Sequence, residues 1–345
     1  MRNNKILLIY TGGTIGMQKD TTSGVLVPFD FSKIFEQIPE LQLINKKIDT
    51  ISFEYPIDSS NIRPHHWVKL SEIIETHYDN YDGFVILHGS DTMAYTASAL
   101  SFMLENLSKP VILTGSQLPI GDLRTDAKEN IITSIEIAGS YESEHPVVPE
   151  VAIYFEFKLL RGNRTVKASA EHFNAFDSPN YAPLAQSGVH LKFFKHRILP
   201  PSQGIFSTHK KFDPNVIVLK IHPGLTEEQL SYIINIPHLK AIILETYGSG
   251  NALTDRWFHR ILKSAVEEKG IHLVNKTQCL YGNISPYKYE TGRKLMETGA
   301  FNGKDITTEA ALTKMMYLLG KKLSKKALKQ AFERPIRGEM NAETL

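Results

Sequence analysis

The stretch Lys5-Ile6-Leu7-Leu8-Ile9-Tyr10-Thr11-Gly12-Gly13-Thr14-Ile15-Gly16 sets the expectation for the fold. Its first five residues form an apolar run with the length and β-branched content of a strand that is buried on both faces. The chain then turns at once, and Gly12 and Gly13 let backbone N–H groups approach whatever lies above the strand end. The hydroxyl of Thr14 lies there and either caps the following segment or belongs to a functional site. This stretch by itself favours neither interpretation.

Two later strand ends have the same character. The apolar runs 83–87 and 110–113 predict buried strands, and they end in His88-Gly89-Ser90-Asp91-Thr92 and Thr114-Gly115-Ser116-Gln117. Helical spacing of apolar residues over 94–107 lies between them. Strands and helices that alternate with short connections are typical of βαβ units and a parallel sheet, in which the carboxyl ends of the strands share one edge. The sequence therefore predicts a polar pocket lined by hydroxyl groups at that edge.

The remaining pattern continues the α/β alternation. Further strands are predicted at 51–55, 151–157, 215–221, 241–246 and 271–275, and further helices at 66–79, 226–235, 255–269, 308–319 and 324–332. The expected fold class is α/β with two domains: a larger N-terminal domain over 1–195 around a mostly parallel sheet, a Pro/Ser/Gly-rich linker over 196–214, and a smaller, flavodoxin-like domain over 215–345. The segment 17–30 is predicted to be a surface loop beside Thr14, where a lid would lie.

Composition narrows the class of partner. The 345 residues favour two domains, and 42% apolar with 22% charged residues describe an ordinary globular protein. A net charge of +2 gives no reason to expect nucleic acid or an anionic membrane as a partner, which favours a small ligand. The single cysteine, Cys279, excludes an internal disulfide and a cysteine-cluster metal site. With no signal peptide expected before the first strand and no apolar run near the ~20 residues of a membrane span, the expected location is cytoplasmic.

An alcohol nucleophile at this edge needs a base. His88 is the only histidine beside a strand-end motif, and a structural hydrogen-bonding role is favoured for it. A lysine can act instead if its surroundings keep part of it uncharged. Lys167 is the candidate, with Asp91 to orient it and Ser90 as the hydroxyl between it and the substrate, although a solvated lysine is the better interpretation of Lys167 taken alone.

Cofactor motifs are weak or absent. The first turn lacks the first glycine of G-x-G-x-x-G, and no G-x-x-x-x-G-K-[ST] occurs in the chain. His65-His66 has no acidic or thiol partner at metal-ligand spacing and is interpreted as part of a helix start. Neither a cofactor nor a metal is expected.

Residues 11–15 together with 87–93 closely resemble the two signature motifs of bacterial-type L-asparaginases, in the asparaginase/glutaminase family. The similarity extends through 95–107, 114–117, 161–165 and 247–252, covers nearly the whole chain, and is greatest to the cytoplasmic type I branch.

The resemblance implies an amidohydrolase that converts L-asparagine to L-aspartate and ammonia through a threonine-linked acyl-enzyme, without metal or cofactor. It places Thr14 at the nucleophile position. Ser90, Asp91 and Lys167 fall on the second triad, in which the hydroxyl and the lysine handle protons while the carboxylate orients the lysine and helps to hold the substrate. Hydroxyls, backbone N–H groups and one carboxylate suit a small zwitterion such as asparagine, and N–H groups of the strand-end turns would stabilise an oxyanion.

Further roles rest on the same resemblance. Asp58, Ser59 and Ser60 fall on the loop that binds the α-amino and α-carboxylate groups of the substrate. A homodimer or homotetramer is implied, because the family completes its sites across a subunit interface, and Asn251 is expected to reach the neighbouring site. Many members carry a tyrosine on the loop after the first motif, but 18–30 has none, so Tyr289 is the candidate for that role.

The chain departs from the family pattern at two other places. Ser90 stands where threonine is usual, which keeps the hydroxyl and loses the methyl group that restricts its rotamer. Thr277, Gln278 and Cys279 match a regulatory asparagine site of some type I members. In that site Val166 and Glu245 replace the expected threonine and arginine, and Glu245 would repel a substrate carboxylate, which argues against allosteric activation.

The sequence is also compatible with two other functions. An amino-acid sensor would keep the pocket and lack turnover, and the intact Thr14, Asp91 and Lys167 argue against it. Hydrolysis of another amide, such as glutamine or an aspartyl-tRNA-linked amide, remains possible because the size of a pocket cannot be read from a sequence.

Overall fold

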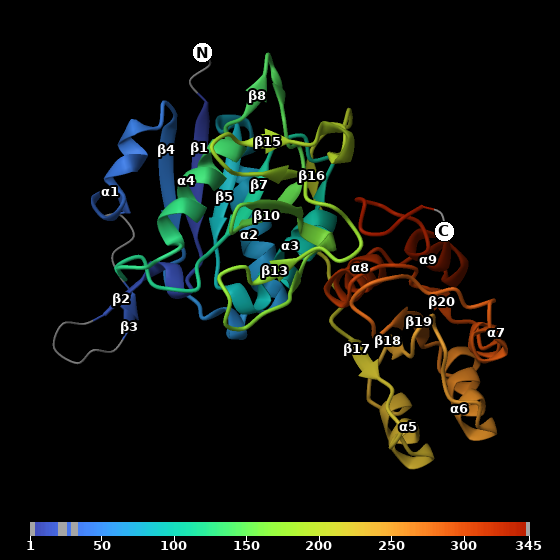
Figure 1. Ribbon diagram of the computed structural model, residues 1–345. Helices are drawn as coiled ribbons and strands as arrows, with labels where there is room; N and C mark the ends of the chain where they lie inside the picture. Colours follow the sequence, from blue (N-terminus) through green and yellow to red (C-terminus); the bar gives the residue numbers. More distant parts are fainter. Residues whose placement is uncertain (1–3, 20–25, 29–33, 343–345) are drawn as a thin grey trace. The chain divides into compact units, whose positions relative to one another are not determined.

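The computed structural model describes residues 4–19, 26–28 and 34–342 of the chain. The chain divides into two compact units, Met1–Lys210 and Lys211–Leu345. Each unit is built around a parallel or mostly parallel sheet with helices packed against it (Figure 1). The predicted fold class, two α/β domains of unequal size, is confirmed.

Among the described residues of the first unit, the main sheet has eight strands. In order across the sheet they are β15 (Lys192–Phe193), β14 (Ala185–Gln186), β11 (Lys158–Arg161), β10 (Val151–Phe155), β7 (Val111–Thr114), β5 (Gly83–Leu87), β1 (Lys5–Tyr10) and β4 (Lys47–Ser52). The five strands from β10 to β4 run parallel, and β11, β14 and β15 extend the sheet in antiparallel fashion.

The register brings three strand ends together. Tyr10 at the end of β1 lies beside Leu87 of β5, and Leu87 lies beside Thr114 of β7. The segments that follow these residues therefore leave the sheet side by side, which confirms the predicted convergence of the polar strand ends.

Helices α2 (Pro64–His77), α3 (Met93–Met103) and α4 (Ala127–Ala138) connect the parallel strands. Helix α4 packs on the face of the sheet that carries Leu8, Val85 and Ile112. Ile9 and Ile86 point to the opposite face and are fully buried as well. Because both faces are covered, the strands are continuous apolar runs, and the prediction of buried strands at β1 and β5 is confirmed.

Among the described residues of this unit, the shorter elements include α1 (Ile34–Gln37) and four strand pairs. The pairs are β2 (Met17–Lys19) with β3 (Leu26–Pro28), β6 (Leu104–Glu105) with β16 (Ser207–Thr208), β8 (Tyr141–Glu142) with β9 (His145–Pro146), and β12 (Val166–Lys167) with β13 (Phe176–Asp177). The surface loop expected over 17–30 thus contains the pairing of β2 with β3, while 20–25 and 29–30 lie outside the described residues.

Several expected boundaries in this unit differ from those of the structure. The strand expected over 51–55 is β4, which begins at Lys47 and ends at Ser52. The helix expected over 94–107 ends at Met103, because Leu104 and Glu105 pair with β16 instead. The segment 196–214, expected to be a linker, supplies β16 and stacks Phe206 on Tyr78 with ring centroids 3.6 Å apart, so much of it is packed onto the first unit.

The second unit has a four-stranded parallel sheet in sequential order: β17 (Val216–Lys220), β18 (Ala241–Thr246), β19 (His272–Thr277) and β20 (Phe301–Asn302). Its helices are α5 (Glu227–Ile234), α6 (Arg256–Glu267), α7 (Glu290–Glu297), α8 (Thr308–Gly320) and α9 (Lys325–Phe332). The four helices expected here are confirmed, whereas α7 is an addition. No helix in the described part of the chain is long and apolar enough to cross a membrane.

Candidate active site

The turn after β1 brings two strand-end loops into contact. Gly12 and Gly13 have φ of 132° and 89°, values that favour glycine. A Cβ on Gly13 would lie 2.5 Å from the Cα of Gly89, and one on Gly12 would lie 2.2 Å from the carbonyl oxygen of Ile57. The turn therefore touches the loop after β5 and the loop after β4 at once. This close approach places Thr14 one residue from the contact with the loop that carries Ser90.

The two threonines of the turn have different surroundings. Thr11 is buried, and its Oγ1 donates to the carbonyl oxygen of Leu87 at 2.9 Å, so its hydroxyl is committed to holding the strand ends together. Thr14 is half-buried and begins a short 3-10 turn that runs to Gly16. Tyr10 supports that turn from below, because its Oη donates to the carbonyl oxygen of Gly16 at 3.2 Å. Burial raises the pKa of Tyr10 to about 12, so it stays protonated as a donor.

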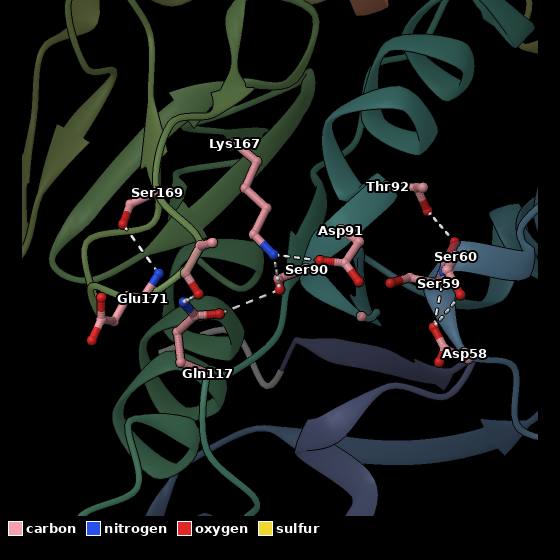
Figure 2. A network of polar contacts seen from close by, with 12 residues as sticks. Asp58, Ser59, Ser60, Ser90, Asp91, Thr92, Gln117, Lys167, Ser169 and Glu171 are labelled. Carbon is pink, nitrogen blue, oxygen red and sulfur yellow. Dashed lines mark hydrogen bonds and ion pairs between the residues drawn. The ribbon is translucent and has the colours of Figure 1, made fainter.

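Lys167 joins Ser90 and Asp91 from 76 or more residues away along the chain (Figure 2). Its Nζ donates to Ser90 Oγ at 2.9 Å and to Asp91 Oδ1 at 2.5 Å. The side chain of Lys167 is 19% exposed and that of Asp91 is 61% exposed. The three residues of the expected second triad thus form one connected group, with a half-buried lysine at its centre and an exposed carboxylate beside it.

His88 lies just before this group and is fully enclosed. Its Nδ1–H donates to the carbonyl oxygen of Gly89 at 2.7 Å, which leaves Nε2 to accept from Thr96 Oγ1 at 2.9 Å. Thr96 Oγ1 also accepts a hydrogen bond from Trp67 Nε1 at 3.1 Å, and this bond leaves the hydroxyl proton of Thr96 available to His88. Burial lowers the pKa of His88 to about 4, so the ring is neutral and serves the loop structure. The predicted structural role of His88 is confirmed.

The loop after β4 forms the opposite wall (Figure 2). Asp58 caps a short turn by accepting from the N–H and from the hydroxyl of Ser60, both at 2.9 Å. The backbone N–H bond, followed by the hydroxyl bond, lowers the pKa of the Asp58 carboxyl, so it stays ionised. Thr92 Oγ1 donates to the carbonyl oxygen of Ser59 at 2.7 Å and ties this loop to the start of α3. The loop expected to bind substrate is therefore fastened to the loop of Ser90 and Asp91.

Gln117 belongs to the same network, although the sequence assigned it no role. Ser90 Oγ donates to Gln117 Oε1 at 3.3 Å, and Gln117 Nε2 donates to the carbonyl oxygen of His172 at 3.1 Å (Figure 2). Its place directly after Gly115 and Ser116, at the third polar strand end, is the sequence signal that could have indicated a role for Gln117.

Two predicted residues lie in the second unit. Asn251 forms an isolated bridge with Tyr247, and its Oδ1 accepts from Thr291 Oγ1 at 2.7 Å. Tyr289 precedes α7 and is 49% exposed. Their roles beside Thr14 stay predictions.

The residues that resemble a regulatory site lie where β19 ends. Thr277 is buried, and its Oγ1 accepts from the N–H of Cys279, whose side chain is exposed. Gln278 Nε2 donates to the carbonyl oxygens of Ile221 at 2.6 Å and of Glu245 at 2.9 Å, so the donors of this amide are occupied within the unit. Val166, expected to matter for the same site, is a buried residue of β12 in the first unit.

No group of three or more His, Cys, Asp or Glu side chains that could hold a metal ion occurs among residues 4–19, 26–28 and 34–342. Hydroxyl groups, one lysine and carboxylates are the chemistry that the strand ends offer.

Comparison with known proteins matches both units. The family described as Asparaginase, N-terminal, matches residues 5–199, and the Glutaminase/Asparaginase C-terminal domain matches residues 215–332. L-asparaginase 1 of Escherichia coli (strain K12) is 40% identical over 344 residues, which is 99% of this chain and 100% of that protein. These matches define a two-domain class of amidohydrolases. The chain belongs to the asparaginase family.

Solved structures agree over the full length. L-asparaginase I from Vibrio cholerae O1 biovar eltor str. N16961 superposes with a TM-score of 0.89 at 38% identity, covering 99% of this chain and 100% of its own. The thermostable L-asparaginase from Thermococcus kodakarensis gives a TM-score of 0.90 at 33% identity, covering 98% and 100%. The resemblance in the signature motifs is therefore confirmed at the level of family and fold.

Proposed function

We propose that this chain is an L-asparaginase that hydrolyses L-asparagine to L-aspartate and ammonia, with Thr14 as the nucleophile. The observation that carries the proposal is the bridge from Lys167 Nζ to Ser90 Oγ and Asp91 Oδ1, on a loop that touches the nucleophile turn. Family membership supports the reaction, and the bridge supports the assignment of Ser90 and Lys167 to the proton handling that an alcohol nucleophile requires.

In the first half of the reaction, Thr14 Oγ1 attacks the side-chain amide carbon of asparagine while its proton passes to a base. The backbone N–H groups of the Gly13 and Gly89 turns are the candidates to stabilise the tetrahedral oxyanion. The amide nitrogen takes a proton as the C–N bond breaks and leaves as ammonia. The aspartyl group is then esterified to Thr14.

In the second half, water attacks the ester carbon and Thr14 regains its proton. Ser90 and Lys167 are the candidates to pass a proton, and the Nζ–Oγ separation of 2.9 Å supports this assignment. Asp91 accepts from the lysine through Oδ1, and its side chain is 61% exposed. The carboxylate is therefore the candidate to bind the α-ammonium group of the substrate. The hydroxyl groups of Ser59 and Ser60, beside the ionised Asp58, are the candidates for the other end of the zwitterion.

The decisive experiment compares Thr14→Val with Thr11→Val, two substitutions that remove a hydroxyl from the same turn. Ammonia release from L-asparagine is expected to fall by roughly three orders of magnitude or more in Thr14→Val, because the nucleophile is gone. In Thr11→Val the hydrogen bond from the hydroxyl to Leu87 is lost, which should cost about 1 kcal/mol of stability while the turnover rate stays close to that of the parent. Full activity in Thr14→Val would exclude Thr14 as the nucleophile.

Two related proposals depend on the same assay. Comparing L-asparagine with L-glutamine decides the substrate preference, and calorimetric binding of asparagine without product would indicate an amino-acid sensor. We also propose a homodimer or homotetramer in which Asn251 and Tyr289 help to complete a site. Light scattering gives the oligomeric state, and Tyr289→Phe tests the tyrosine. A cytoplasmic location fits the single cysteine, Cys279, which has no second thiol in the chain to pair with.

A further inference from the structure

The side chain of Gln117 is fixed in one orientation beside Ser90. Its Nε2 donates to the carbonyl oxygens of His172 at 3.1 Å and of Ala170 at 3.5 Å. Carbonyl oxygens only accept hydrogen bonds, so these contacts decide which end of the amide is nitrogen. Gln117 Oε1 is therefore the end that faces Ser90 Oγ, at 3.3 Å (Figure 2).

The backbone of Gln117 is held as firmly as its side chain. Its N–H lies 3.1 Å and 3.0 Å from the two carboxyl oxygens of Asp126, a buried side chain at the start of α4. Asp126 also accepts from the N–H of Leu118 at 3.2 Å and from Asn130 Nδ2 at 3.3 Å. With both ends anchored, Gln117 presents a rigid acceptor to Ser90.

The hydroxyl of Ser90 has one proton and two lone pairs to distribute. Lys167 Nζ donates a hydrogen bond to one of these lone pairs, with the two atoms 2.9 Å apart. The Ser90 hydroxyl donates its hydrogen bond to Gln117 Oε1, which leaves the second lone pair of Oγ for a substrate or a water molecule. A serine side chain has no β-branch to limit its rotamers, so these two bonds supply the restraint.

We propose that Gln117 is a positioning residue that holds the Ser90 hydroxyl in the rotamer facing Lys167, in place of the steric restraint that a β-branched side chain would give. The inference rests on the proposed function, in which Ser90 passes a proton to and from Lys167. Without Gln117 the hydroxyl samples other rotamers and loses its alignment with Lys167, which lowers kcat more than it raises KM.

A double-mutant cycle on the full chain tests this role. Gln117→Leu keeps a side chain of similar size and removes the acceptor, and kcat for L-asparagine is expected to fall roughly tenfold. Ser90→Thr serves as a second background, whatever its own kcat. In that background Gln117→Leu is expected to lower kcat by less than about threefold, because the added methyl group restrains the hydroxyl. Equal losses in the two backgrounds would overturn the proposal.

Ser169→Ala is the matched control for the loop that Gln117 also holds. Ser169 Oγ accepts from the N–H groups of Glu171 at 3.2 Å and of His172 at 3.0 Å, so it supports the same loop without touching Ser90 (Figure 2). Its loss is expected to change kcat by the same small factor in both backgrounds. A loss as large as that of Gln117→Leu, equally unrelieved by Ser90→Thr, would show that the loop alone matters and overturn the proposal.

Crystal structures of the parent and of Gln117→Leu give a readout that is independent of turnover. The parent is expected to show one Ser90 rotamer within hydrogen-bond distance of Lys167 Nζ, and the variant more than one. An inactive parent would overturn the proposed function and leave this comparison intact. A single, unchanged Ser90 rotamer in Gln117→Leu would overturn the role assigned to Gln117.

Discussion

Each unit holds a lysine paired with a carboxylate near the strand ends of its main sheet, and the two pairs differ in how far they are exposed. In the first unit, Lys167 contacts Ser90 and Asp91, and the carboxylate side chain is 61% exposed. In the second unit, Lys276 Nζ lies 3.6 Å from Glu245 Oε1, and the two side chains are only 7% and 14% exposed. A lysine paired with a carboxylate therefore occurs at both strand ends, open to a ligand in one and enclosed in the other.

The second group is closed by its own hydrogen bonds. Lys276 Nζ donates to Thr308 Oγ1 at 3.0 Å, and Thr308 Oγ1 donates to Glu245 Oε1 at 2.5 Å. Gln278 uses its amide N–H groups on the carbonyl oxygens of Ile221 and Glu245. Polar side chains thus gather at the carboxyl ends of the parallel strands in both units. In the second unit their mutual hydrogen bonds occupy the groups that a ligand would otherwise contact.

The largest contrast is expected from removing the first lysine. Lys167→Met should lower kcat by about a thousandfold, because the only cation that contacts both Ser90 and Asp91 among the described residues is lost. The thermal midpoint should change little, since Asp91 is largely exposed and is solvated without its partner. Steady-state ammonia release and a melting curve measure the two effects. Retention of most activity would mean that Lys167 has only a structural role.

Lys276→Met is the matched change in the second unit and should show the opposite profile. Burial lowers the pKa of Lys276, and the neighbouring Glu245 opposes that shift, as in a buried ion pair. Removing the lysine leaves Glu245 without a cationic partner at 14% exposure and with Thr308 as its remaining side-chain donor, which should cost about 3 kcal/mol of stability. Denaturant unfolding followed by fluorescence measures this loss, and activity per folded molecule should stay within about twofold of the parent. A large loss of kcat without a loss of stability would contradict the distinction between the two lysines.

His88 is a closed group inside the open site, and its pH dependence should reveal this. Its pKa of about 4 in the folded chain lies below the ordinary 6.5, so between these values only the unfolded chain binds the proton. Stability is therefore unaffected above pH 6.5 and falls as the pH drops toward 4, by roughly 3 kcal/mol in total.

Calorimetric unfolding of the parent and of His88→Gln between pH 7 and pH 4 measures this contribution. The variant should lose less stability over that range, because it has no proton to take up on unfolding. Identical curves for the parent and His88→Gln would show that His88 is not held neutral.

The strand ends of the first unit were predictable because local signals agree there. A buried apolar run followed by glycine and a hydroxyl residue marks β1, β5 and β7, and parallel pairing then brings Thr14 and Ser90 to one edge. The role of Lys167 needed the family resemblance, because its strand has two residues and no periodicity. Nothing near Lys167 in the sequence indicates Ser90 as its partner.

Other features depend on contacts that the local sequence does not carry. The orientation of Gln117 is set by the carbonyl groups of Ala170 and His172, more than fifty residues later in the chain. Backbone acceptors have no side-chain signature, so such a bond cannot be inferred from residue types. The pairing that encloses Glu245 likewise requires α8 to place Thr308 above the strand end.

The smallest effect is expected at the proposed regulatory residues, where the comparison predicts no response to asparagine. A second asparagine at Thr277, Gln278 and Cys279 would need the amide of Gln278, which is bonded to two carbonyl oxygens, and would place its carboxylate near the carboxylate of Glu245. Initial rates should therefore follow a hyperbolic curve with a Hill coefficient of about 1, and Gln278→Leu should keep that shape. A sigmoidal curve that becomes hyperbolic in Gln278→Leu would show instead that the second strand end opens to a ligand.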